Sequence, residues 1–226
     1  MKKLLSLLAL GLPLLTGCPQ KDPTEHMGMQ SPQELIKTMF ESPDPDMRRG
    51  AICELASHGY GLQESYLKGY AAIAQRDSDP SVRCAALRAL GSGGNARYIA
   101  PAIAALQDPN PTVRQDAAIA LDSMVDAQAT GPLCDRSAND TSTEVRCAAA
   151  KALRHYRQPG VVDVLVAALS DAEFCVRFQA RNSLREITGL DGGHEPAAWR
   201  KLLAEKTPAT PASPPASQPA PATIKL

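Results

Sequence analysis

A short phrase that recurs five times constrains this chain more than any other feature of its sequence. An apolar residue is followed by arginine at intervals of 35, 31, 32 and 31 residues, in Met47-Arg48, Val82-Arg83, Val113-Arg114, Val145-Arg146 and Val176-Arg177. Alanine stands four positions after each apolar residue (Ala51, Ala86, Ala117, Ala149 and Ala180) and leucine eight positions after it. This spacing places all three on one face of a helix.

Each of these helices is preceded by a polar turn and by another apolar stretch. The turns carry Asp, Asn and Pro, which cap a helix and end the one before it. The apolar stretches predict first helices over 35–41, 65–75, 98–106 and 161–169, and only a short, weak one over 133–138. We therefore expect an all-α chain, an α-solenoid of about five stacked helical hairpins.

The second copy of the phrase carries a family resemblance. Asp77 to Gly91 matches D-x-x-x-x-V-R-x-x-A-x-x-A-L-G throughout, and this resembles the HEAT repeat in its short bacterial form, the phycobilisome-lyase HEAT-like repeat. The first copy departs most, as a capping repeat should. The resemblance implies that each arginine pairs with the turn aspartate of an adjacent repeat. Arg83, Arg114, Arg146 and Arg177 would then form a ladder with Asp77, Asp108, Asp140 and Asp171.

The amino-terminal end of the chain is typical of a bacterial lipoprotein. Lys2 and Lys3 precede an apolar stretch that is too short to span a membrane. The stretch ends in Leu15-Thr16-Gly17-Cys18, which resembles a lipobox, where the cysteine is acylated and the peptide is cut before it. We expect a signal peptide over 1–17 and a linker over 18–30 that starts at the lipidated Cys18.

The lipid anchor would hold the mature chain at a membrane surface of the cell envelope. Lipoprotein sorting reads an Asp after the cysteine as retention in the inner membrane, and this chain has Pro19 instead. An outer-membrane or periplasmic address is therefore favoured.

The carboxyl-terminal end divides into a capping helix and a tail. Pro196 can open a last helix that carries Trp199, so the solenoid is expected to extend over 31–204. Residues 205–226 are rich in Pro, Ala, Thr and Ser and cannot bury a core, which predicts disorder.

Five cysteines remain once Cys18 is lipidated, and their spacing is not that of a zinc site. We expect either at least one structural disulfide or buried thiols that pack as small apolar groups. Cys134 and Cys147 lie on successive helices of one repeat, whereas Cys147 and Cys175 lie near the starts of helices in neighbouring repeats. The sequence does not choose between these pairings.

Composition and motifs argue against several classes of function. The expected mature chain carries two more acidic than basic residues. This charge balance provides no positive potential to attract a polyanion and argues against nucleic-acid binding. The four histidines share no metal-ligand spacing, and no catalytic motif is present. We expect no enzyme activity, no cofactor and no metal.

The sequence instead favours a scaffold that binds a protein or peptide at the membrane surface through the second helices of its repeats. Two alternatives remain, a structural envelope protein that binds through its Pro/Ala-rich tail and a lyase-like enzyme of the bilin-lyase HEAT class. Helical phase suggests six exposed contact residues on the inner surface, namely Arg49, Glu54, Gln115, Asp116, Lys151 and Phe178.

Overall fold

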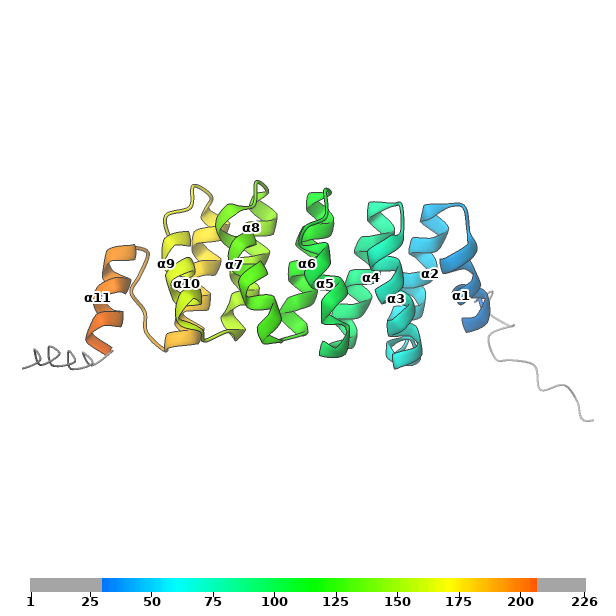
Figure 1. Ribbon diagram of the computed structural model, residues 1–226, viewed down its shortest axis with the longest axis horizontal. Coiled ribbons are helices and arrows are strands. Elements are labelled where there is room, and N and C mark those ends of the chain that lie inside the picture. Colours follow the sequence, from blue (N-terminus) through cyan, green and yellow to red (C-terminus); the bar gives the residue numbers. More distant parts are fainter. Residues whose placement is uncertain (1–29, 207–226) are drawn as a thin grey trace, which may run out of the picture.

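Five helical hairpins stack side by side in one row in the computed structural model, which describes residues 30–206 (Figure 1). The first helices are α1 (Pro32–Glu41), α3 (Glu64–Arg76), α5 (Ile99–Ala105), α7 (Thr130–Asn139) and α9 (Pro159–Ala168). The second helices are α2 (Pro45–Ser57), α4 (Pro80–Gly93), α6 (Pro111–Ser123), α8 (Thr143–Ala152) and α10 (Phe174–Thr188), and α11 (Pro196–Lys206) closes the row. The predicted α-solenoid of about five repeats is confirmed.

Both ends of the sequence lie outside the part of the chain that the structure describes. These are the signal peptide and linker with Cys18, of which only residue 30 is described, and residues 207–226 of the tail. Residues 205 and 206 belong to α11. Within residues 30–206, no helix combines the length and the apolar character that crossing a membrane requires.

Side-chain caps fix where α2, α4, α6 and α8 begin, whereas the side chain of Glu173, before α10, makes no capping hydrogen bond. The Asp79 carboxylate accepts hydrogen bonds from the backbone N–H groups of Ser81 and Val82, and Asn110 caps α6 in the same way. Proline occupies the first turn of α2, α4 and α6, where no backbone N–H partner is needed. The turn residues read from the sequence therefore act as N-caps.

Short 3₁₀ turns connect or extend the repeats, and the sequence pattern did not predict them. They are η2 (Gly59–Leu62), η3 (Ala96–Tyr98), η4 (Ala127–Ala129) and η5 (Leu153–His155). In η2 only glycine fits at position 61, because a Cβ there would lie 1.8 Å from the carbonyl oxygen of Leu55. The weak helix expected over 133–138 was also predicted too short, since α7 forms ten residues over 130–139.

The repeated apolar positions form one continuous core. The valines of repeats two to five and all five repeated alanines and leucines are buried. Met47 is the exception, with 49% of its surface exposed, although the sequence pattern predicted that it would pack. The first repeat has no preceding repeat to cover it, so this position stays open to solvent.

Small residues bring the second helices close together. Neighbouring second helices pack more tightly on each other than neighbouring first helices do, most closely α4 on α6. A Cβ at Gly91 would lie only 3.0 Å from the Cα of Ala120, so the two backbones nearly touch there. Because the second helices lie closer together than the first, they form the inner, concave side of the row.

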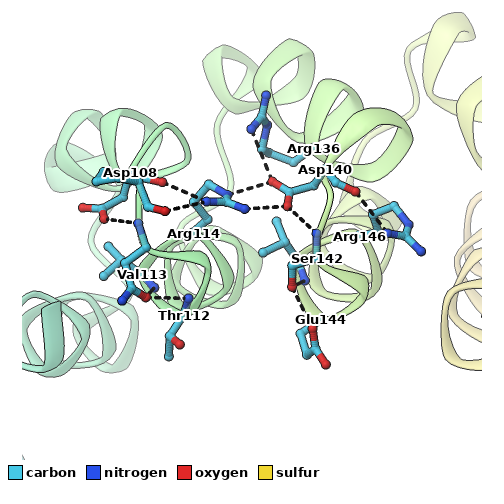
Figure 2. Close-up of polar contacts among 12 residues, drawn as sticks. Asp108, Thr112, Val113, Arg114, Arg136, Asp140, Ser142, Glu144 and Arg146 are labelled. Atoms are coloured by element: carbon cyan, nitrogen blue, oxygen red, sulfur yellow. Dashed lines mark hydrogen bonds and ion pairs between the residues drawn. The ribbon is translucent and has the colours of Figure 1, made fainter.

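Arginine–aspartate pairs join each repeat to the next one. Arg114 donates from Nε and Nη2 to the two carboxylate oxygens of Asp140, at 2.8 Å each, and from Nη1 to the main-chain oxygen of Asp108 in its own turn (Figure 2). The same bidentate arrangement joins Arg48 to Asp77, Arg83 to Asp108 and Arg146 to Asp171. The ladder is present.

The arginines of the ladder are those of repeats one to four, whereas the family resemblance predicted those of repeats two to five. Asp77 is bound by Arg48 of the first repeat, while Arg177 makes no ion pair within residues 30–206. Arg177 bonds instead to the carbonyl oxygens of Asp171 and Ala172 in its own turn. No sixth hairpin follows α10 within residues 30–206, so no next turn aspartate is described there for Arg177 to bind.

The charged partners in the ladder have shifted pKa values. Burial alone would raise the pKa of Asp140, but hydrogen bonds from Arg114 and the N–H of Ser142, with the charges of Arg114 and Arg136, lower it overall. The hydrogen bonds from Arg146 chiefly lower the pKa of Asp171. Both carboxylates are therefore ionised at neutral pH.

The last helix closes the far end of the core. The Trp199 ring is fully buried, and its Nε1 donates to the main-chain oxygen of Gly193 at 3.0 Å. A Cβ at Gly192 would lie 2.7 Å from the indole ring, so glycine is required beside it. Trp199 occupies the place expected of a capping residue.

We predict that Asp140→Ala lowers the free energy of unfolding by about 3 kcal/mol, because it leaves the nearly buried Arg114 without its carboxylate. Urea denaturation followed by circular dichroism measures this. Arg49→Ala is the control, since it breaks the exposed pair with Asp46 and should cost less than about 1 kcal/mol. Equal losses in the two variants would contradict a structural ladder.

We also predict that acid destabilises the fold through the ladder. The folded-state pKa values of Asp140 and Asp171 lie below the unfolded value of about 3.9, so their stabilisation is present above that pH. It is lost as pH falls from about 5 through the lowered folded-state values. Urea midpoints between pH 7 and pH 3 measure the loss, which should be smaller in Asp140→Asn.

Candidate functional site

The six suggested contact residues all lie on second helices, but they do not share one environment. Arg49, Lys151 and Phe178 are exposed, and Glu54 and Gln115 are half-buried. Arg49 is held by Asp46 at 2.9 Å, on the first repeat. Only Gln115 and Lys151 line the same groove.

Asp116 was wrongly assigned as an exposed contact. Its surface is only 3% exposed, and its Oδ2 lies 2.9 Å from Nη2 of Arg88 on the preceding second helix. The thiol of Cys84 lies beside it. Burial first, then the hydrogen bond and negative charge of Asp116, raise the pKa of Cys84 to about 12. Asp116 therefore joins α6 to α4 and does not face a partner.

A groove of about 300 Å³ lies on the concave side across α6, α8 and α10, and we call it the central groove. Its wall combines apolar, thiol and polar side chains. They are Gln115, Ile119, Thr143, Glu144, Cys147, Ala148, Lys151, Cys175 and Gln179. Ile119 is 45% exposed, which is high for a large apolar side chain on a helix that packs on both sides.

A second groove of about 610 Å³ adjoins the first, since Gln179 lines both. We call it the C-terminal groove. It is mainly polar and lies over the second half of α10, the residues that follow it and Arg154. Its lining is Arg154, Gln179, Asn182, Arg185, Glu186, Gly189, Leu190 and Asp191.

A polar cluster borders the two grooves. Asp122 lies on α6, 3.4 Å from Nζ of Lys151, 3.2 Å from Nη2 of Arg154 and 2.9 Å from Nε2 of His155. One carboxylate thus faces three basic side chains from the following repeat. This cluster orients Lys151 and Arg154 along the groove walls.

An aromatic pair lies at the first turn of α10. The rings of Phe174 and Phe178 are 5.9 Å apart, and the Arg177 guanidinium lies 5.9 Å from the Phe174 ring centre. Phe174 is 65% exposed. Together with Ile119, these rings are the exposed large apolar side chains of α6 and α10.

Helical phase gave two residues of the central groove, Gln115 and Lys151, but missed Ile119 and the residues of the C-terminal groove. Phe178 lines neither groove. An alignment of the five repeats with one another carried the information that was missed. Position one after the arginine holds Gln115, Cys147 and Phe178, and position five holds Ile119, Lys151 and Asn182. Aligning the repeats on their arginines would have brought out Ile119 and Asn182 as members of these two columns.

The described residues also bear on the sequence expectations for metal sites and disulfides. Within residues 30–206, no three or more His, Cys, Asp or Glu side chains are arranged to hold a metal ion. All five cysteines of that range are thiols, so the expected disulfide among Cys134, Cys147 and Cys175 is not formed in this structure.

Comparison with known proteins agrees with the prediction of HEAT-type repeats. A family model of HEAT repeats matches residues 67–140 and 130–205, together more than half of the chain. The sequence matches no curated protein.

Solved structures share the fold at low identity. The complex of CpcE and CpcF of phycocyanin lyase from Nostoc sp. has a TM-score of 0.63 at 21% identity, covering 84% of this chain and 74% of that one. A designed armadillo repeat protein scores 0.57 at 19% identity, covering 78% and 88%. Another, in complex with the peptide (KR)4, scores 0.53 at 20% identity, covering 79% and 94%. At these identities the likeness shows the fold alone.

Proposed function

Because the chain belongs to the HEAT-repeat family, we propose that it is a non-enzymatic scaffold that binds a protein or peptide partner along its concave side. The observation that carries the proposal is the pair of adjoining grooves across α6, α8 and α10. An extended segment that follows both grooves would meet apolar side chains first and charged ones next.

The mixture of side chains suits such a partner. Ile119 and Phe178 expose apolar surface to water, and burying such apolar side chains supplies most of the binding free energy of a protein interface. Arg154 and Arg185 offer guanidinium groups for carboxylates or main-chain carbonyls. The designed armadillo protein bound to the (KR)4 peptide supports a peptide-binding role for this architecture.

We further propose that Cys18 carries a lipid anchor, so that the grooves are presented at a membrane surface of the cell envelope. The support is the sequence of the first eighteen residues. Stable anchoring needs more than one acyl chain, which lipoprotein processing provides.

A second candidate is an enzyme that resembles the bilin lyases. The likeness to the CpcE and CpcF complex favours it, though only at the level of the fold. A bound bilin would colour the purified protein, so visible absorbance decides between the two candidates. Absorbance that persists after gel filtration would support the lyase.

We predict that Ile119→Glu weakens partner binding about tenfold or more, because it buries a charge in the apolar part of the central groove. Crosslinking of the full-length chain in membranes, followed by mass spectrometry, identifies the partner, and titration of the purified pair gives the affinity. Val125→Glu is a matched control, because Val125 is 46% exposed but lies outside both grooves.

A chain truncated after Lys206 should keep the partner. Binding that disappears with the truncation, and survives Ile119→Glu, would move the function to the Pro/Ala-rich tail and overturn the groove proposal. Circular dichroism of each variant checks that it is folded.

We predict that Cys18→Ser releases the protein from membranes, because no other cysteine stands at a lipobox. Detergent phase partitioning and the mass of the amino-terminal peptide measure anchoring and processing. A wild-type protein that partitions into the aqueous phase without acyl chains would refute the anchor, whatever the grooves bind.

A further inference from the structure

Two cysteines from neighbouring repeats meet in the central groove. Cys147 lies in the first half of α8, and Cys175 lies in the first turn of α10. The Cys147 thiol donates to the main-chain oxygen of Cys175 at 3.6 Å, and both side chains line the groove. Residues 28 positions apart in the chain are thus in direct contact.

The two thiols have different surroundings. Cys175 is exposed and Cys147 is only partly so. Burial raises the pKa of the Cys147 thiol to about 12, and a hydrogen bond and charge interaction with the Cys175 side chain add to the effect. The Cys147 sulfur lies against the main chain of Cys175, and the more exposed Cys175 is the thiol that a reagent reaches first.

We propose that Cys147 and Cys175 form an oxidisable thiol pair that closes to a disulfide between the fourth and fifth repeats. Of the pairings left open by the sequence, the geometry selects this one. Cys134 lies on α7 and makes no contact of this kind in the described part of the chain. The pair stands independently of the proposed binding function.

The oxidant is a small or protein disulfide, for which glutathione disulfide is the probe. The Cys175 thiolate attacks one sulfur of the oxidant and forms a mixed disulfide, and the first reduced thiol leaves with the proton that Cys175 gave up. Cys147 then loses its proton and attacks the Cys175 sulfur, releasing the second reduced thiol. The protein loses two protons and two electrons, and the oxidant gains them.

The order of the two steps follows from exposure. A half-buried thiol with a raised pKa is a poor first nucleophile, because little of it is thiolate at neutral pH. It needs only to reach the neighbouring sulfur in the second step. Cys175 therefore acts as the attacking thiol and Cys147 as the resolving thiol.

Peptide mapping of the full-length protein tests the pair without any variant. The protein is equilibrated with glutathione disulfide, its free thiols are alkylated, and it is cut with trypsin. Cleavage after Arg146, Lys151, Arg157 and Arg177 releases peptides 147–151 and 158–177. We expect these two peptides to be joined as the main disulfide, and the joined species to raise the melting temperature by several degrees.

Cys175→Ser should abolish both the linkage and the mixed disulfide on this pair, whereas Cys147→Ser should trap the mixed disulfide at Cys175. Cys53→Ser is the control, because Cys53 is exposed but lies on the first repeat. It should leave the linkage unchanged. Both peptides recovered fully alkylated in excess oxidant, or Cys134 joined to Cys147 instead, would overturn the proposal.

Discussion

The bidentate contact between an arginine and the turn aspartate of the next repeat is the interaction on which this architecture depends. Arg114 fills the space between two turns with five planar donors, so it fixes distance and orientation together. Lysine, a point charge on a flexible stem, could not do so. Because Asp140 also accepts the N–H of Ser142, the N-cap residue of α8, the same carboxylate orders the turn before α8 and holds the repeat before it.

This arrangement separates stability from recognition on α6 and α8. In these two helices the buried alanine and leucine face the core, whereas the positions one and five after the arginine line the central groove. Gln115 and Ile119 can therefore vary without disturbing Arg114 beside them. A repeat protein of this kind can change its partner while keeping its fold, since stacking contacts involve nearest neighbours only.

The repeated motif was sufficient to predict most of the helices and most of the core, because both recur at fixed positions. The ladder was predicted from the family resemblance, which assigned Arg177 to it in place of Arg48. Departures from the pattern were harder to predict. Asp116 stands at position two after the arginine, where the preceding repeat has Ala85, and a small apolar residue there should have indicated that Asp116 packs against a neighbouring helix. Met47 and Arg177 differ because each lies at an end of the ladder. The central groove is lined by side chains from three second helices, so no single position encodes it.

The first turn of α10 departs from the repeat pattern at two positions. In repeats one to three the position three before the arginine is proline, but α10 has Phe174 there. The next position is Asp46, Ser81, Thr112 or Glu144 in the first four repeats and Cys175 in the fifth. In the described part of the chain no sixth repeat covers this turn, and Arg177 contacts the Phe174 ring and the carbonyl oxygens of its own turn. The end of the ladder thus exposes an aromatic ring and a thiol beside the central groove, where every earlier repeat presents a proline or a polar side chain.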